Sequence, residues 1–195
     1  AAYGLLRFAL PLFPEASAEF APYAMVLGLV GIVYGAIVAF AQTDIKRLVA
    51  YTSISHMGFV MIAIYSGSEV ALQGAVVQMI AHGLSAAGLF ILCGQLYERL
   101  HTRDLRQMGG LWGRLRYLPG VMLFFSVASL GMPGTGNFVG EFLILVGSFQ
   151  VAPVITAVAT FGLVLASVYS LIMLQRACFG PAKDESMLKG LDRRE

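Results

Sequence analysis

Long runs of apolar residues without a charged side chain dominate the chain. An incomplete run covers residues 1–14, and the others cover residues 22–41, 48–66, 70–97, 117–149 and 152–179. A helix needs about 20 mostly apolar residues to cross about 30 Å of hydrocarbon, whereas barrel strands are about 10 residues long and alternate apolar with polar positions. The pattern therefore predicts an all-α, polytopic bundle of transmembrane helices, with residues 1–14 as the end of a truncated helix.

The composition excludes several other classes of protein. Hydrophobic residues make up 58% of the 195 residues and charged residues only 12%, against roughly 45–50% and 25% in soluble domains. Cys93 and Cys178 lie far apart with no neighbouring ligand cluster, so we expect neither a metal site nor a disulfide framework. The net charge of +2 is too small to indicate a nucleic-acid partner.

The distribution of charge predicts an orientation in the membrane. If each run crosses once, every Lys and Arg except Arg7 falls on one side, in the loop at 42–47, the connection at 98–116 and the segment 176–195. The opposite loops hold only acids, namely Glu15, Glu19 and Glu69. By the positive-inside rule the basic side is cytoplasmic, and residues 180–195 form a polar tail there.

The run at 117–149 is interrupted in the middle by helix-breaking residues, namely Gly131, Pro133, Gly134 and Gly136. Two crossings here would move the basic tail to the acidic side, so we predict one crossing by a discontinuous helix. Freed backbone groups must then be buried in protein or line a wet cavity. The alternative is a packing kink that binds nothing.

The connection at 98–116 alternates leucines with charges and has Tyr97, Trp112 and Tyr117 near its ends. This pattern is typical of an amphipathic surface helix with interfacial aromatic anchors. A solvated linker without a functional role is the other interpretation.

Three ionisable side chains interrupt the apolar runs at similar depth: His56, His82 and Glu141. At about 1.5 Å per residue, His56 lies about 13.5 Å from the basic edge, and all three fall near the midplane. An intramembrane carboxylate indicates a functional site, and histidine beside it can pass protons, so we predict a proton relay. Neutral polar residues near them could support it, namely Tyr51, Ser53, Ser55, Gln78, Ser85 and Asn137. The alternatives are a structural ion pair, a buried neutral acid and ordinary core histidines.

Three segments carry a resemblance to a known family: residues 44–58 (DIKRLVAYTSISHMG), 81–83 (AHG) and 131–142 (GMPGTGNFVGEF). They resemble the antiporter-like membrane subunits of respiratory complex I. The resemblance covers the chain and implies one half of an inverted-repeat fold, whose other half is missing here. It makes Glu141 the terminal proton carrier, places His56 and His82 in a midplane row, and puts Lys46 where protons would enter.

The resemblance also implies the partners. This chain would hold no cofactor, and NADH, flavin, iron–sulfur clusters and quinone would belong to partner subunits. Other membrane subunits of the complex, including neighbouring antiporter-like ones, would flank it in a bacterial cytoplasmic membrane, and protons and ordered water would move through it.

The hypothesis from sequence is therefore a proton-translocating subunit of the NADH:quinone oxidoreductase, with no redox chemistry of its own. One alternative is a sodium/proton antiporter subunit of the related multisubunit cation antiporters, with Asn137 and Thr135 near an ion site. The other is a membrane scaffold that transports nothing.

Overall fold

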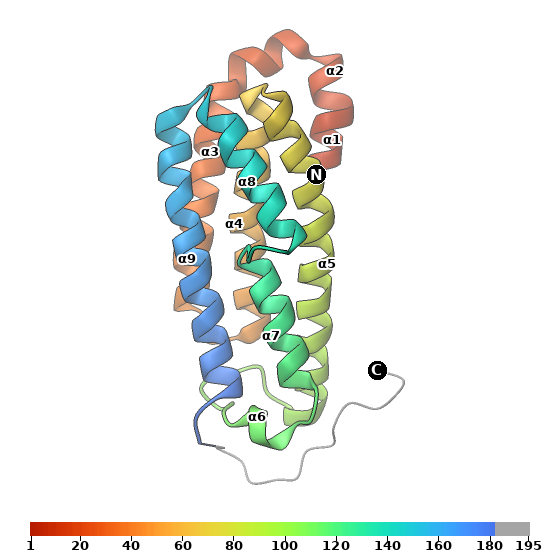
Figure 1. Cartoon of the computed structure of the whole chain (residues 1–195), viewed down its shortest axis with the longest axis vertical. Coiled ribbons are helices and arrows are strands. Elements are labelled where there is room, and N and C mark those ends of the chain that lie inside the picture. Colours follow the sequence, from red (N-terminus) through yellow and green to blue (C-terminus); the bar gives the residue numbers. More distant parts are fainter. Residues whose placement is uncertain (182–195) are drawn as a thin grey trace.

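The computed structural model describes residues 1–181 and is helical almost throughout this range (Figure 1). The elements in chain order are α1 (Ala2–Gly4), η1 (Leu5–Ala9), α2 (Leu10–Leu12), α3 (Pro14–Ala41), α4 (Ile45–Ser66), α5 (Glu69–Leu100), α6 (Leu111–Arg114), α7 (Leu118–Ser129), α8 (Gly136–Phe149) and α9 (Pro153–Cys178). Helices α3, α4, α5 and α9 are long and apolar enough to cross a membrane. The all-α bundle predicted from the sequence is thus confirmed.

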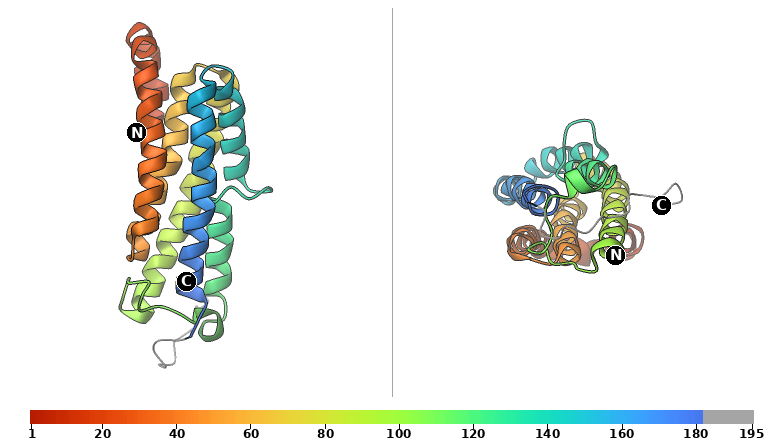
Figure 2. Two further views of the ribbon diagram at one scale, coloured as in Figure 1. Left: turned by 90° about the vertical axis from the view of Figure 1, so that its left-hand side faces the viewer. Right: turned by 90° about the horizontal axis from the view of Figure 1, so that it is seen from below.

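The long helices stand roughly side by side, and α7 and α8 follow each other along one further column (Figures 1 and 2). Glycines set the closest approaches. A Cβ at Gly58 of α4 would lie 2.5 Å from the carbonyl oxygen of Gly28 on α3, and a Cβ at Gly74 of α5 would lie 2.7 Å from the backbone nitrogen of Ile144 on α8. Small residues at such contacts let helix backbones approach closely. The resulting van der Waals packing stabilises helix association in lipid, where the hydrophobic effect does not drive helices together.

The discontinuous helix is present. Its halves, α7 and α8, are separated by residues 130–135, which bulge away from the bundle (Figure 2, left). Gly131 and Gly134 have φ of 77° and 99° in this segment, a region that glycine enters without the steric cost paid by other residues. The break predicted from Gly131, Pro133, Gly134 and Gly136 therefore lies where the sequence indicated.

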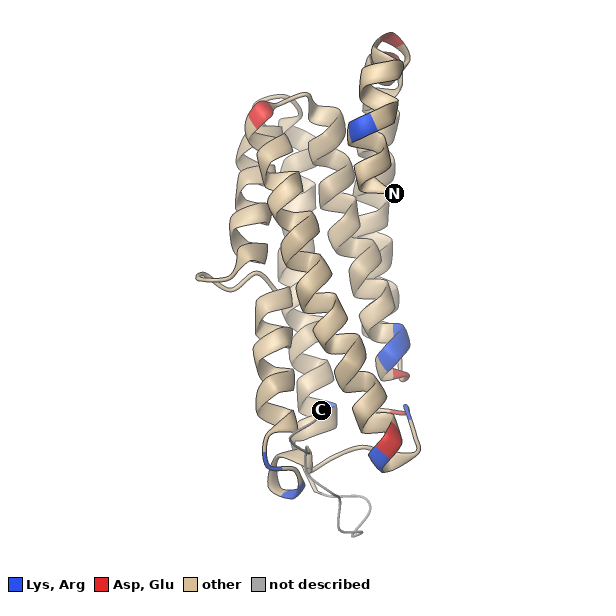
Figure 3. Ribbon diagram, turned by 90° about the vertical axis from the view of Figure 1, so that its right-hand side faces the viewer, with Lys and Arg blue, Asp and Glu red and all other residues tan. Residues whose placement is uncertain are grey.

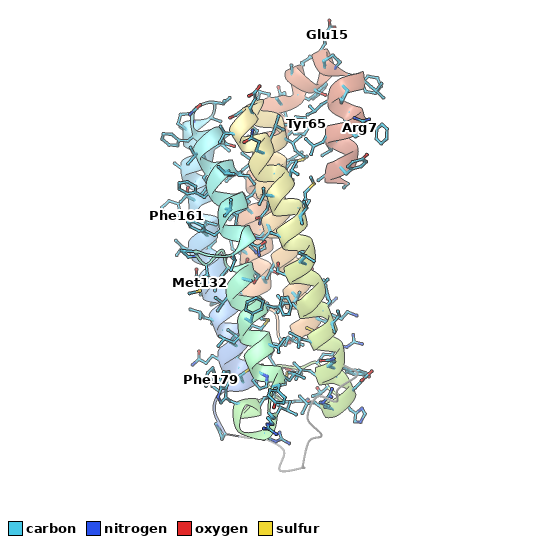
Figure 4. All side chains as sticks on the ribbon, turned by 45° about the vertical axis from the view of Figure 1, so that its right-hand side comes forward. Arg7, Glu15, Tyr65, Met132, Phe161 and Phe179 are labelled. Carbon is cyan, nitrogen blue, oxygen red and sulfur yellow. The ribbon has the colours of Figure 1, made fainter. Side chains whose placement is uncertain are left out.

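The N-terminal part differs in its boundaries from the sequence prediction. Residues 2–12 are helical, the chain turns at Phe13, and α3 begins at Pro14 rather than at residue 22. Helical hydrogen bonding does not stop where the charge-free run stops, so α3 extends past Glu15 and Glu19. Arg7 and Glu15 lie in this hairpin, at the end of the molecule opposite Phe179 (Figure 4).

The prediction of a surface helix at 98–116 is wrong for most of that segment. Helix α5 ends at Leu100, and the following residues form turns and loop up to the short α6. Gly109 and Gly110 have φ of 149° and 65°, which a continuous helix does not allow. The apolar side chains of this segment point into the bundle instead, where Leu105, Met108, Leu111 and Leu115 join the core.

Backbone hydrogen bonds tie three connections together at this end of the bundle. Ile45 N donates to Arg103 O at 3.0 Å, Leu105 N donates to Thr43 O at 2.8 Å, and Gly110 N donates to Phe179 O at 3.3 Å. The loop therefore closes the end of the bundle. The aromatic residues Tyr97, Trp112 and Tyr117 are 43%, 48% and 55% exposed there, so their role as interfacial anchors stays a prediction.

Lysine and arginine collect at this closed end (Figure 3), and Arg7 is at the opposite one (Figure 4). The chain's predicted polar tail, residues 180–195, lies outside the described residues except for Gly180 and Pro181. Lys183, Lys189, Arg193 and Arg194 belong to it, so the charge asymmetry is visible for the described residues only.

Candidate functional site

The centre of the site is the carboxyl group of Glu141 on α8, which is 2% exposed. Side chains of a helix lean toward its N-terminus, so Glu141 reaches back toward the helix break. Its Oε1 lies 2.8 Å from Nδ1 of His56 on α4 and accepts a hydrogen bond from Nε2 of Gln78 on α5 at 3.0 Å. Three helices thus converge on one carboxyl oxygen.

Helix α5 supplies a polar face to this centre. Gln78, His82 and Ser85 are spaced by four and three residues, which places them on the same side of the helix, and all three are buried. The His82 ring lies 5.1 Å from the His56 ring, measured between centroids, at an interplanar angle of 40°. The structure therefore brings Glu141, His56 and His82 together as one cluster.

Asn137 links the break to α5. Its Nδ2 donates to the carbonyl oxygen of Ala128 at 2.7 Å and to Oγ of Ser85 at 3.1 Å, and Ser85 Oγ donates to His82 O at 3.3 Å. Ala128 stands at the end of α7, where carbonyl groups lose their helical partners. Asn137 therefore satisfies part of the broken backbone and holds α8 at a fixed place beside α5.

The second oxygen of Glu141 faces the break. A Cβ at Gly131 would lie 2.6 Å from Glu141 Oε2, so only glycine leaves this oxygen its space. A cavity of about 310 Å³ adjoins it, lined by residues 130–133 of the break, by Glu141 and three apolar residues of α8, and by Leu163 and Ser167 of α9. The two carboxyl oxygens consequently have different surroundings: Oε1 contacts His56 of α4 and Gln78 of α5, and Oε2 is turned to the break.

Several buried polar atoms around the cluster have no hydrogen-bond partner within residues 1–181. They include Oε1 of Gln78, Nδ1 of His82 and Oδ1 of Asn137. Buried polar atoms of this kind are usually satisfied by ordered water. The arrangement can pass a proton between Glu141 and His56 directly, because 2.8 Å is a hydrogen-bond distance.

Sequence reasoning missed Tyr169 of α9. This side chain is 1% exposed, and its hydroxyl lies 3.3 Å from Nε2 of His56. The available signal was its position inside an apolar run, away from the membrane interfaces where tyrosine usually gathers. Tyr51 is only partly buried and packs against the apolar cluster that includes Tyr169.

The other predicted residues lie outside the cluster. Lys46 is exposed in the first turn of α4, about 15 Å along the helix axis from His56 at about 1.5 Å per residue. Ser53 bonds its own helix at Val49 O. Ser55 donates across to Ile32 O on α3 at 3.0 Å and also lies within hydrogen-bonding reach of the Tyr169 hydroxyl, so it touches the edge of the cluster. Ser55 thus joins α4 to α3 below His56, and Ser53 has a local role.

Comparisons with known proteins identify relatives over the full chain. A family model described as "NADH:quinone oxidoreductase/Mrp antiporter, TM" matches residues 1–167. The chain is 76% identical over 195 residues to the NADH-quinone oxidoreductase subunit M of Pseudomonas aeruginosa, covering 38% of that protein. It is 74% identical over 198 residues to the subunit M of Escherichia coli K12, covering 39%. The chain therefore spans about two fifths of the length of these curated relatives.

Two solved structures have a similar fold. A chain of the respiratory complex I from Thermus thermophilus with bound NADH matches 98% of this chain with a TM-score of 0.93 and 34% sequence identity, over 41% of its own length. A chain of the Mrp complex from Dietzia matches 96% of this chain with a TM-score of 0.85 at 16% identity, over 38% of its length. The second likeness shows the fold alone.

Proposed function

The chain belongs to the NADH:quinone oxidoreductase/Mrp antiporter family of membrane proteins, and from this premise we propose that it carries protons in the membrane arm of an NADH:quinone oxidoreductase. The observation that supports the proposal most directly is the buried contact of 2.8 Å between His56 and Glu141. A structural pair would not need a second histidine beside the first, and the His82 ring lies 5.1 Å from the His56 ring.

The two oxygens of Glu141 have different roles in this proposal. When the group is a carboxylate, Oε1 accepts hydrogen bonds from His56 and Gln78, which compensate its charge in the apolar interior. A proton that arrives from the cavity is placed on Oε2, which has no other partner among the described residues, whereas a proton that arrives from His56 is placed on Oε1. Oε2 faces the break, so we place proton exchange with the cavity there.

The histidines connect Glu141 with the interior of the bundle. His56 can pass a proton to Oε1 directly, and its ring contacts that of His82. Two charged imidazoles at this separation repel, so we expect the positive charge to occupy one ring at a time. The unpaired Nδ1 of His82 and Oε1 of Gln78 support water as the further carrier.

The remaining parts of the proposal concern the surroundings. We place the basic end of the bundle in the cytoplasm of a bacterium, by the positive-inside rule, with Lys46 at the side where protons would enter.

The chain would hold no cofactor, and flavin, iron–sulfur clusters, quinone and the NADH site would be in partner subunits. Its exposed apolar faces would be covered by lipid and by other membrane subunits, including neighbouring antiporter-like ones. Phe161, which is 69% exposed, lies on such a face (Figure 4).

The proposal is tested on the full-length protein in its assembled complex. Sodium-free inverted vesicles are given NADH, and proton uptake, NADH oxidation and assembly are measured together. We expect uptake without sodium, and its loss when Glu141→Gln, His56→Gln and His82→Gln are combined. His101→Gln with Glu69→Gln is the control, since both residues are exposed and lie outside the cluster.

Each other result favours a different function. Transport that needs sodium and proceeds without NADH would identify a sodium/proton antiporter subunit. Undiminished uptake in the combined variant would identify a scaffold, and the cluster would then be only structural.

A separate prediction isolates the free carboxyl oxygen. We expect Gly131→Ala to reduce proton uptake several-fold, because the new methyl group displaces Oε2 of Glu141 from the break. Gly134→Ala is the matched comparison: its φ of 99° imposes the same kind of backbone strain, about 1–2 kcal/mol, but a Cβ there meets nothing within 4 Å. Equal losses in the two variants, measured as uptake per assembled complex, would show that strain alone is responsible.

A further inference from the structure

His56 has a hydrogen-bond partner at each of its ring nitrogens. Nδ1 faces Oε1 of Glu141 at 2.8 Å, and Nε2 faces the hydroxyl of Tyr169 at 3.3 Å. The imidazole is 2% exposed and the tyrosine 1%, so solvent does not replace either partner. The proton relay described above uses the Glu141 side and leaves the Tyr169 side without a function.

The groups around His56 come from each helix that packs against α4 at this depth. Helix α8 contributes Glu141, α5 contributes Gln78 and His82, and α9 contributes Tyr169. Helix α3 contributes only a backbone carbonyl, Ile32 O, which accepts from Ser55. Tyr169 is therefore the group whose hydrogen bond can adjust when Nε2 of His56 gains or loses its hydrogen.

A hydroxyl is suited to this place because it both donates and accepts. When Glu141 is a carboxylate, His56 donates from Nδ1, and the Tyr169 hydroxyl donates to the bare Nε2. A proton delivered along the proposed water path through His82 makes His56 an imidazolium, whose Nδ1 proton then moves to Oε1 of Glu141. His56 keeps the hydrogen on Nε2, and the Tyr169 oxygen accepts it. In the imidazolium form both nitrogens donate, to Glu141 and to Tyr169.

We propose that Tyr169 is a positioning residue of the relay, whose hydroxyl reverses its hydrogen bond with Nε2 and thereby lets buried His56 change between its protonation forms. This inference rests on the proposed proton transport. No covalent step is involved: the phenol keeps its proton, and rotation about its C–O bond is the only movement. A phenylalanine would leave the Nε2–H of His56 without an acceptor, which a buried polar group tolerates poorly.

The test uses Tyr169→Phe in the full-length protein and assembled complex, with Tyr65→Phe as the control. Tyr65 is on α4 with His56, is partly buried, and packs in a different cluster from Tyr169. We expect Tyr169→Phe to lower NADH-driven proton uptake about tenfold, as for loss of a hydrogen bond to a charged group, with assembly retained. Tyr65→Phe should transport as the unaltered protein does.

A spectroscopic readout separates positioning from packing. Histidine is labelled with ¹⁵N, and the signals of His56 are obtained by difference from the His56→Gln complex. The unaltered protein should show a population with hydrogen on Nε2, and Tyr169→Phe should show only the form with hydrogen on Nδ1. A loss of uptake with unchanged His56 signals would overturn the inference, and so would unaltered uptake in Tyr169→Phe.

Glu141→Gln is measured in the same experiment. If it stops uptake while Tyr169→Phe does not, the role of Tyr169 is refuted and the proposed function stands. If Glu141→Gln transports normally, the proposed function fails, and the role of Tyr169 fails with it.

Discussion

Glu141→Gln in the full-length protein should reduce NADH-driven proton uptake to less than about a tenth while the complex still assembles. The amide has nearly the shape of the carboxyl group, and its oxygen can still accept from Gln78, whose Nε2 lies 3.0 Å from Oε1. It cannot take up and release a proton at neutral pH. Groups that transfer protons in a rate-determining step typically contribute about 10²–10⁴-fold.

The control for this variant is Glu69→Gln, which changes the same residue type at the exposed first turn of α5. It should transport protons at the unaltered rate. Uptake is followed together with NADH oxidation and with assembly on native gels. Normal uptake by assembled Glu141→Gln complexes would show that the buried carboxyl group is structural, whereas failure to assemble would show that its hydrogen bonds hold α4, α5 and α8 together.

Gly74→Ala should destabilise the protein by about 1–3 kcal/mol, the usual cost of an added group in a close-packed contact. The new methyl group would lie 2.7 Å from Ile144 N and 2.8 Å from Gly140 O. Helices α5 and α8 must then separate, which lengthens the hydrogen bond between Gln78 and Glu141. We therefore expect a lower unfolding temperature of the purified complex and, in the fraction that assembles, reduced proton uptake.

Gly83→Ala is the matched control for Gly74→Ala, since it lies in the same helix and a Cβ there meets nothing within 4 Å. It should be neutral or stabilising by up to about 1 kcal/mol, because alanine favours the helix over glycine. Equal unfolding temperatures for the two variants would contradict the close contact between α5 and α8.

The sequence was sufficient for the features that depend on one-dimensional patterns. Charge-free runs long enough to cross the bilayer predict helices, because lipid leaves the backbone no hydrogen-bond partner except itself, and Gly131 with Pro133 predicts a break. Depth along a helix is also a matter of counting residues, which is why His56, His82 and Glu141 were expected at one level. Their membership of one site was a hypothesis until the helices were placed.

The sequence was misleading where an apolar pattern had two solutions. The apolar positions at 98–116 are compatible with a helix lying on the membrane surface. They are equally compatible with a loop whose side chains fill the end of the bundle, and these are Leu105, Met108, Leu111 and Leu115. Burial there removes them from water on all sides, and the glycine pair at 109 and 110 prevents the helical alternative. Which surface an amphipathic segment covers depends on what else lies at that end of the molecule.

The sequence by itself determined the helices, the break and the depth of the ionisable groups, because hydrophobic length and backbone chemistry are local. Only the tertiary structure decided which side chains meet. The contact between Glu141 and His56 joins α8 to α4, and the contact between His56 and Tyr169 joins α4 to α9. Such contacts depend on how each helix is rotated about its axis, and close contacts between helices, including those at Gly58 and Gly74, decide that rotation.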